Sequence, residues 1–226
     1  HASLESFEHL LHNNQHHLLT PSMLFAYTAF MNNCSFVNFT PNIGSNIPAL
    51  RDLSLQKEIP HCGNDGKTGE TLLKTVLAPM FFQRQFKVLS WEGINMLGNN
   101  DGLALSHSEN RKLKIENKSE VLPQMLGYSP HTGVDINYVP SLGDWKTAWN
   151  FIHFEGFMDV KMSMQFTWQG CDSILAAPLV LDLVRLTEFS SRVGEYGPMN
   201  HVSAFFKNPL DDNDMSFPSQ MQKLYD

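Results

Sequence analysis

Cysteine is scarce in this chain, and the few cysteines present form no paired motif. The three residues Cys34, Cys62 and Cys171 lie far apart, and no C-x-x-C spacing occurs. An odd number of widely spaced thiols argues against a disulfide framework and against a zinc site built on cysteine pairs. Reduced thiols of this kind are typical of a cytosolic protein, so we expect a cytoplasmic location.

Basic residues and long apolar runs are also few. Lys and Arg number 16 against 23 Asp and Glu, a formal net charge of -7, which argues against electrostatic steering to nucleic acid or an acidic membrane surface. The longest apolar stretch, near 174–184, is interrupted by Asp182 and is too short to cross a bilayer. We therefore expect neither nucleic acid nor membrane as a partner, although a local basic pocket could still bind a small anion.

Two nucleotide-binding fingerprints are missing. No G-x-G-x-x-G occurs anywhere in the chain. The triplet at 66–68 (GKT) suggests a phosphate-binding loop, but such a loop needs a glycine where this chain has His61, and residues 59–60 make a poor preceding strand. A P-loop is therefore not expected.

A histidine cluster near the N-terminus could in principle bind a metal ion. Its members share one helical stretch at i, i+3 and i+4 spacing: His9, His12, His16 and His17. No acidic or cysteine co-ligand stands at a matching position, so a solvated polar face is the favoured interpretation and no metal site is expected.

The first part of the chain has the order of elements of an α/β sheet. Apolar spacing predicts a helix over 4–19, and Thr20 and Pro21 predict the start of a second helix. A strand at 35–40 and a helix at 48–56 follow, which is the alternation expected of α/β proteins. This part of the chain has too few predicted strands to form a complete domain.

The remainder favours two-layer α+β packing. A helix is predicted over 68–85, a strand over 86–91, and a half-buried antiparallel strand over 160–168, where apolar and polar residues alternate. The apolar face of that last strand is either core or a subunit interface. A long, mostly buried helix is predicted at 171–192, and the polar stretch 211–218 is expected to be disordered.

Six short segments, taken in order, carry the functional signal. They are GNDGKTG at 63–69 with Lys74 and Thr75, LGNNDG at 97–102, the stretch 105–119, YVP at 138–140 with GDWK at 143–146, CDSILAAPL at 171–179, and FFKNPL at 205–210. In this order they resemble the myo-inositol-1-phosphate synthase family. The resemblance runs from about residue 38 to 210 and is closest to a divergent, short bacterial or archaeal-type member.

The resemblance implies a fold and an assembly. The fold is α/β plus α+β: a remnant of a Rossmann-type NAD-binding domain over 1–62, an inserted α+β catalytic and oligomerisation domain over 63–170, and a return to the first domain over 171–226. The Gly-rich N-terminal NAD-binding portion, which would precede Ala2, is expected to be lacking. A homotetramer or homodimer through the middle-domain sheet is expected.

The resemblance also implies a reaction, in which D-glucose 6-phosphate is cyclised to 1D-myo-inositol 3-phosphate by oxidation at C5 with NAD, enolisation, aldol closure and reduction. Lysines suit such chemistry because they hold phosphate, stabilise oxyanions and, when buried, pass protons. The implied catalytic residues are Lys114, Lys146 and Asp65. The implied substrate-binding residues are Lys118, Asn99, Asn100 and Lys67. The implied cofactor-binding residues are Asp101, Asp172, Ser173 and Thr68.

Two alternatives stay open from the sequence. No residue aligns securely with the last lysine of the family site, and Lys207 and Lys223 are the only late candidates. The chain could also be a non-catalytic oligomerising or sugar-phosphate-binding module, since the dinucleotide fingerprint is missing. Taken alone, NNDG is typical of a turn, Asp172 of a helix cap and the lysine run of a solvated face.

Overall fold

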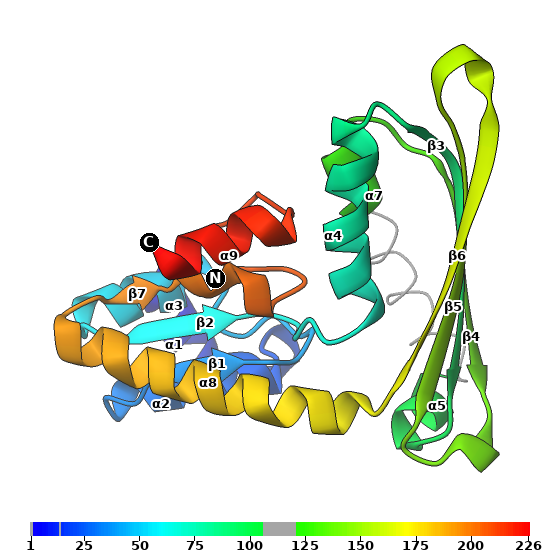
Figure 1. Ribbon diagram of the computed structural model, residues 1–226. Coiled ribbons are helices and arrows are strands. Elements are labelled where there is room, and N and C mark those ends of the chain that lie inside the picture. The colour runs from blue at the N-terminus through cyan, green and yellow to red at the C-terminus, as the bar shows by residue number, and fades with distance from the viewer. Residues whose placement is uncertain (1, 14, 106–120) are drawn as a thin grey trace. The chain divides into compact units, whose positions relative to one another are not determined.

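The computed structural model describes residues 2–13, 15–105 and 121–226, which fold into two compact units (Figure 1). Unit 1 comprises residues 1–67, 177–214 and 219–226, and unit 2 comprises residues 68–176 and 215–218. Each unit has its own β-sheet and its own apolar core. The protein is thus a mixed α/β chain with one parallel and one mixed sheet.

Unit 1 is built on a three-stranded parallel sheet of order β1-β2-β7. Its strands are β1 (Phe36–Asn38), β2 (Pro60–Gly63) and β7 (Gly197–Pro198). Asn38 pairs with Gly63, so β1 and β2 end at the same level. The segments that follow them, 39–42 and 64–67, therefore leave the sheet together at its carboxyl edge.

Helices pack on both faces of this sheet because β2 is buried on both. Its successive side chains alternate, so His61 contacts the ring of Phe30 while Cys62 joins a second core with Leu183 and Phe206. The first core holds α1 (Leu4–His12), α2 (Pro21–Met31) and α3 (Pro48–Gln56), and the second holds α8 (Asp172–Val193), the 3-10 helix η4 (Asn200–Phe205) and α9 (Phe217–Tyr225).

The helix starts in this unit agree with the sequence prediction better than the helix ends. The Thr20 hydroxyl accepts from the Met23 N–H and Pro21 is the first residue of α2, as predicted. The single helix predicted over 4–19 is wrong, because α1 stops at His12 and a 3-10 turn, η1 (His16–Leu18), follows. At the stop, the Asn13 side chain donates to the His9 carbonyl, a local bond that competes with helix continuation.

Unit 2 is built on a four-stranded sheet of order β4-β3-β5-β6. Its strands are β3 (Lys87–Leu97), β4 (His131–Tyr138), β5 (Lys146–Glu155) and β6 (Lys161–Gly170). Only β3 and β4 run parallel; the other pairs are antiparallel. Helices α4 (Glu70–Gln83) and α7 (Val121–Leu126) cover one face, over a core that includes Phe81, Trp91 and Ile152 (Figure 1).

The alternating strand predicted at 160–168 is confirmed as antiparallel β6. Its Met162, Met164 and Phe166 side chains pack on the core under α4, so its apolar face is core. The predicted strand 86–91 is too short, because β3 continues to Leu97. The apolar pattern fades there since the helix-facing positions are Gly93 and Asn95, which the sequence alone does not mark as strand.

The predicted long helix is confirmed as α8, but the prediction that it is mostly buried is wrong. Only Leu183, Thr187 and Ser190 are buried within the described chain, while Ile174 and Leu181 are 72% and 65% exposed. Of the helices the structure describes, none combines the length and hydropathy that a bilayer crossing requires.

The polar stretch 211–218 is ordered, contrary to the expectation of disorder. The carboxylate of Asp212 accepts from Lys223 Nζ at 2.7 Å, and the carbonyl of Asp214 accepts from Gln220 Nε2 at 2.6 Å. Residues 212–214 are therefore bound to the middle and the last turn of α9, an effect that composition does not reveal.

His61 makes unit 1 sensitive to acid. The imidazole is fully buried, its Nδ1 lies 2.8 Å from Ser45 Oγ, and burial together with the nearby positive charge of Arg51 lowers the pKa of His61 to about 3. Because the folded pKa lies below the unfolded value, stability is retained above pH 6.5 and falls as the pH drops towards 3. Between pH 7 and pH 5 the wild-type chain should lose about 2 kcal/mol more than His61→Leu.

Urea unfolding followed by far-UV circular dichroism checks this, with exposed His17→Leu as the control, which should behave as wild type. An equal pH dependence in His61→Leu and wild type would contradict the assignment.

Candidate active site

One end of the unit 2 sheet brings three of the six sequence segments together. Leu97, the last residue of β3, pairs with Tyr138 at the end of β4 and with Lys146 at the start of β5. Lys146 in turn pairs with Gly170 at the end of β6. LGNNDG, YVP, GDWK and CDS all begin or end at these positions, so segments far apart in sequence meet at one edge.

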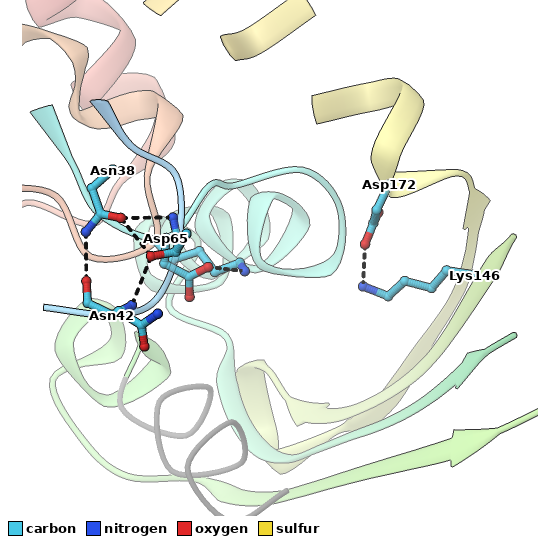
Figure 2. A network of polar contacts seen from close by, with 7 residues as sticks. Asn38, Asn42, Asp65, Lys146 and Asp172 are labelled. Carbon is cyan, nitrogen blue, oxygen red and sulfur yellow. Dashed lines mark hydrogen bonds and ion pairs between the residues drawn. The ribbon is translucent and has the colours of Figure 1, made fainter. Parts of the chain in front are cut away.

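Lys146 and Asp172 form an ion pair at this end (Figure 2), with Nζ 3.1 Å from Oδ2. The Lys146 side chain is 16% exposed and that of Asp172 35%. The register explains the contact, because Lys146 stands opposite Gly170 and α8 begins two residues later at Asp172. A partly buried ammonium held by a single carboxylate is suited to stabilise an oxyanion or to move a proton.

Several buried polar atoms in this unit have no hydrogen-bond partner among the described residues. They are both amide atoms of Asn95, Nδ2 of Asn150, Nε1 of Trp168 and Oδ1 of Asp172. Asn95 and Asn150 lie on the helix-facing side of neighbouring strands, where Asn95 pairs with Ala148 and Asn150 with Gly93. A buried polar atom without a partner costs about 1–3 kcal/mol. Such a set of donors and acceptors is suited to a ligand rich in hydroxyl groups.

A buried ion pair lies against the same strands. Lys74 Nζ is 3.1 Å from Glu70 Oε1, and both side chains are at most 4% exposed. A Cβ at Gly93 would meet Glu70 Oε1 at 3.0 Å and Asn150 Oδ1 at 3.3 Å, so glycine in mid-strand makes room for the carboxylate. The sequence analysis missed Glu70, Asn95, Asn150 and Trp168. Gly93 and Asn95, two positions apart inside a strand, were the sequence signal that could have pointed to this group.

The LGNNDG segment is shaped by a close backbone approach. A Cβ at Gly98 would lie 2.4 Å from the Gly143 nitrogen and 2.6 Å from its carbonyl oxygen. The Asn99 carboxamide oxygen accepts from the Gly102 N–H at 3.2 Å and so caps α5 (Asn100–Leu105), whereas the Asn100 side chain is exposed. Asn99 therefore caps a helix, whereas the sequence of this motif taken alone is typical of a turn.

The other predicted residues of unit 2 have varied settings. Thr68 is half-buried just before α4, and a Cβ at the adjoining Gly69 would lie 3.2 Å from Trp168 Nε1 and 3.5 Å from Asp172 Oδ1. Ser173 is exposed in the first turn of α8, and Asp101 belongs to α5. Lys114 and Lys118 lie outside the described residues.

A second group of predicted residues lies in unit 1. Residues 64–67 pair antiparallel with residues 205–208, and we call this pairing the ribbon. Its bonds include Asn64 N–H to the Asn208 carbonyl at 2.9 Å, Lys207 N–H to the Asp65 carbonyl at 2.6 Å and Lys67 N–H to the Phe205 carbonyl at 2.8 Å.

The ribbon carries an ion pair between Asp65 Oδ1 and Lys207 Nζ at 2.8 Å. Asp65 adopts a left-handed backbone conformation, with φ at 64°. Lys223, the other candidate for the last family lysine, is instead bound to Asp212 at 2.7 Å. The geometry therefore favours Lys207, because it meets a predicted site residue.

Lys67 is enclosed rather than presented to solvent. It is 3% exposed, and its Nζ donates to Gln220 Oε1 at 2.6 Å. Burial lowers the pKa of Lys67 to about 8, against the opposing effect of the Asp212 and Asp214 carboxylates. The expectation that residues 59–60 make a poor strand before the GKT triplet is wrong, because β2 is a fully buried strand. The other argument against a P-loop still holds, since the chain has His61 where such a loop needs glycine.

The carboxyl edge of the unit 1 sheet has polar groups that suit a dinucleotide cofactor. The Asn38 amide bonds to Thr40 Oγ1 at 2.7 Å and to the Asn42 carbonyl at 2.7 Å (Figure 2). The Thr40 carbonyl accepts from the Asp65 N–H at 2.9 Å, and Oδ1 of Asn64 is buried without a described partner. Ligands of parallel sheets bind at this edge. The polar groups of Asn38, Thr40 and Asn64 therefore fit the polar groups of NAD.

The histidine cluster shows no metal geometry in the part of the chain that is described. His12 Nδ1 bonds to the Glu8 carbonyl at 2.7 Å, and His9 Nε2 lies 3.0 Å from Asn13 Nδ2. Among residues 2–13, 15–105 and 121–226 no group of three or more histidine, cysteine or acidic side chains is placed to hold an ion.

Comparison with known proteins agrees with the motif resemblance. The profile of the myo-inositol-1-phosphate synthase family matches residues 69–173, which span the whole unit 2 sheet. The inositol-3-phosphate synthase 1 of Bacteroides thetaiotaomicron is 38% identical over 221 residues, covering 94% of this chain. The chain belongs to the myo-inositol-1-phosphate synthase family.

Solved structures of the family share the fold. A myo-inositol-1-phosphate synthase-related protein from Thermotoga maritima superposes with a TM-score of 0.89 at 27% identity, over 99% of this chain and 61% of its own. The inositol-3-phosphate synthase of Caenorhabditis elegans gives 0.88 at 28% identity, over 99% of this chain and 48% of its own. The chain spans 51% of the length of the Bacteroides family member.

The Gly98 contact predicts a sharp difference between two glycine variants. Gly98→Ala should destabilise unit 2 by about 2–4 kcal/mol, because the added carbon meets backbone that cannot rotate away. Gly170→Ala is the matched control, since a Cβ there has its nearest contact at 3.6 Å, and it should cost under about 1 kcal/mol.

All four tryptophans, Trp91, Trp145, Trp149 and Trp168, belong to unit 2, so tryptophan fluorescence during urea unfolding reports on that unit. Equal stabilities for the two variants would show that the close approach is absent.

Proposed function

We propose that this protein supplies the catalytic part of an NAD-dependent isomerase that converts D-glucose 6-phosphate into 1D-myo-inositol 3-phosphate. The observation that carries the proposal is the Lys146–Asp172 pair at the sheet end where three family-like segments meet. The names of the relatives, inositol-3-phosphate synthases, support it.

Lys146 is the central residue of the proposed mechanism. As an ammonium it stabilises negative charge that develops on the sugar oxygens, and as an amine it takes up a proton. Asp172 orients the Lys146 side chain and balances its charge. The amides of Asn95 and Asn150 supply donors and acceptors to sugar hydroxyls, because hydroxyls can both give and accept hydrogen bonds.

In this proposal, other lysines bind the phosphate and stabilise the remaining oxyanion. Lys118 binds the phosphate, with help from Asn99, Asn100 and Lys67. Lys114 shares with Lys146 the stabilisation of oxyanions and the movement of protons. These roles rest on the motif resemblance and on the physical preference of phosphate for clustered cationic donors.

NAD, when bound, accepts hydride from the sugar and later returns it. Asp65, Asp101, Asp172, Ser173 and Thr68 are the residues proposed to lie near its nicotinamide end. Lys207, paired with Asp65, is proposed as the last lysine of the site.

The unit 1 sheet is proposed to be a remnant of a Rossmann-type domain over residues 1–62, continued by 171–226, with 63–170 inserted. The protein is proposed to be cytoplasmic.

A second candidate is a non-catalytic module that binds a sugar phosphate or drives oligomerisation. It is favoured by the absence of G-x-G-x-x-G from the 226 residues. The buried polar set in unit 2 favours the enzyme, because a purely structural sheet gains nothing from buried amides without partners.

NADH titration followed by cofactor fluorescence, then turnover of glucose 6-phosphate, tests the proposal. Wild type should bind NADH with micromolar affinity and form inositol phosphate, either alone or when joined to the part of the Bacteroides relative that this chain does not cover. Lys146→Ala should reduce turnover at least a thousandfold without unfolding the chain, because oxyanion stabilisation is lost.

Lys87→Ala is the control, since Lys87 is an exposed lysine at the opposite end of β3 that pairs with Glu155, and it should keep wild-type turnover. Near-normal product formation by Lys146→Ala would rule out its proposed role. Sugar-phosphate binding without turnover in every form would favour the second candidate.

The open face of the unit 2 sheet is the proposed contact between subunits of a homodimer or homotetramer. Trp149, Phe151 and His153 stack along β5 with ring centroids 6.4 Å apart. They alternate with buried residues that face α4, so they point to the uncovered face. Half-buried aromatic stripes on an uncovered sheet face are typical of protein interfaces.

Light scattering should therefore give an oligomeric mass for wild type and a monomeric mass for Phe151→Lys, because a buried unpaired charge opposes association. Phe82→Lys changes an exposed phenylalanine of α4 and should leave the mass unchanged. A monomeric wild type, or an unchanged mass for Phe151→Lys, would refute this contact.

A further inference from the structure

The C-terminal helix α9 is unusual because the side chain that it buries completely is polar. Its fully buried residue is Gln220, at 0% exposure, where a short helix would normally bury an apolar side chain. Burying an amide is costly unless its atoms are hydrogen-bonded. Gln220 meets this demand at both ends, since Oε1 accepts from Lys67 Nζ at 2.6 Å and Nε2 donates to the Asp214 carbonyl at 2.6 Å.

The partner of Gln220 lies at the root of the ribbon. The Lys67 N–H donates to the Phe205 carbonyl, and two positions along the same ribbon the Lys207 N–H donates to the Asp65 carbonyl. The side chain and the backbone of Lys67 are therefore fixed by different elements, α9 and the 205–208 strand of the ribbon. The Asp65–Lys207 pair lies immediately beside this junction.

Further bonds hold α9 in place around this contact. Lys223 donates to the Asp212 carboxylate at 2.7 Å, and Ser219 Oγ bonds to Asp214. The 212–214 segment thus joins α9 at both its start and its end. Leu224 packs on the apolar core that includes Phe206.

We infer that α9 is a clasp for the ribbon, in which Gln220 is a positioning residue that fixes Lys67 and thereby the Asp65–Lys207 pair. Gln220 itself touches neither member of that pair in this assignment and acts through Lys67. The benefit for catalysis rests on the proposed function, whereas the mechanical link does not.

The electrostatic setting supports the clasp. The groups that act on the Lys67 ammonium include the neutral amide of Gln220 and the carboxylates of Asp212 and Asp214, with Lys223 bound to Asp212. The neighbouring Asp65 is engaged by Lys207. A neutral amide satisfies the ammonium without the full charge of a carboxylate, and this agrees with a Lys67 pKa lowered by burial to about 8.

Amide hydrogen exchange on the complete chain, resolved by residue, tests the clasp. In Gln220→Leu the amides of Lys67 and Lys207 should exchange at least tenfold faster, while those of β1 and β2 keep their protection. Gln220→Glu should keep the slow exchange of the Lys67 and Lys207 amides, because a carboxylate oxygen still accepts from Lys67 Nζ, although the donor to the Asp214 carbonyl is lost. Gln222→Leu is the matched control on an exposed position of α9, where the side chain reaches only Asp226 among the described residues, and it should match wild type.

A second readout is the titration of Lys67 itself, followed by NMR of its ε-carbon. Gln220→Glu should raise the Lys67 pKa by at least one unit, since it places a negative charge within hydrogen-bonding distance. An unchanged Lys67 titration in Gln220→Glu would show that residue 220 does not contact the ammonium, and this result would overturn the inference.

The inference is overturned if the ribbon amides keep their protection in Gln220→Leu, or lose it equally in Gln222→Leu. It is also overturned if Gln220→Leu speeds exchange evenly across unit 1 and Gln220→Glu does not restore it. None of these outcomes depends on turnover, so the clasp can stand where the proposed isomerase activity fails, and the reverse also holds.

Discussion

The candidate site of unit 2 depends on one register, in which Lys146 stands opposite both Leu97 and Gly170. A slip of one residue along β5 would turn every side chain of that strand to the other face. The ammonium would then leave Asp172, and Asn150 would leave Trp91 Nε1, which donates to its Oδ1 at 2.8 Å. The apolar residues that alternate with them, Ile152 and Phe154, hold the register because they fill the core beneath α4.

The two ends of this sheet face therefore differ, since one is packed for stability and the other keeps polar groups for binding. Its far half is closed by aromatic packing, with Phe81 against Phe154 at 4.9 Å between ring centroids. Its near half keeps buried amides unsatisfied, which lowers stability unless a ligand or ordered water supplies partners. Natural proteins accept such local cost at sites of binding and chemistry, where pre-formed donors and acceptors reduce reorganisation.

How much of this could be predicted from sequence varied with the kind of signal. Motif order gave the family, and period-two alternation gave β6, because both are read from adjacent letters. The extent of β3 was missed, since its helix-facing positions are Gly93 and Asn95 rather than apolar residues. The ion pair of Lys146 with Asp172 could be anticipated only through resemblance, because strand register brings together residues 26 positions apart.

Other misses have an equally physical origin. The polar stretch 211–218 looked disordered because composition ignores specific pairing, such as that of Asp212 with Lys223. The carboxylates that Lys207 and Lys223 meet, Asp65 and Asp212, could not be read from the sequence, because each pair joins residues that the fold brings together. The roles of Lys114 and Lys118 remain predictions from the motif.

The discontinuity of unit 1 has a consequence for the order in which the molecule is made. Residues 68–176 form most of unit 2 as one continuous stretch, whereas unit 1 needs segments from both sides of it. The bond between Lys67 and Gln220 closes a separation of 153 residues, and contacts this distant carry a large loop-closure entropy and form late. During synthesis on the ribosome, unit 2 can therefore fold first, and the ribbon with its Asp65–Lys207 pair is completed only when the last helix has emerged.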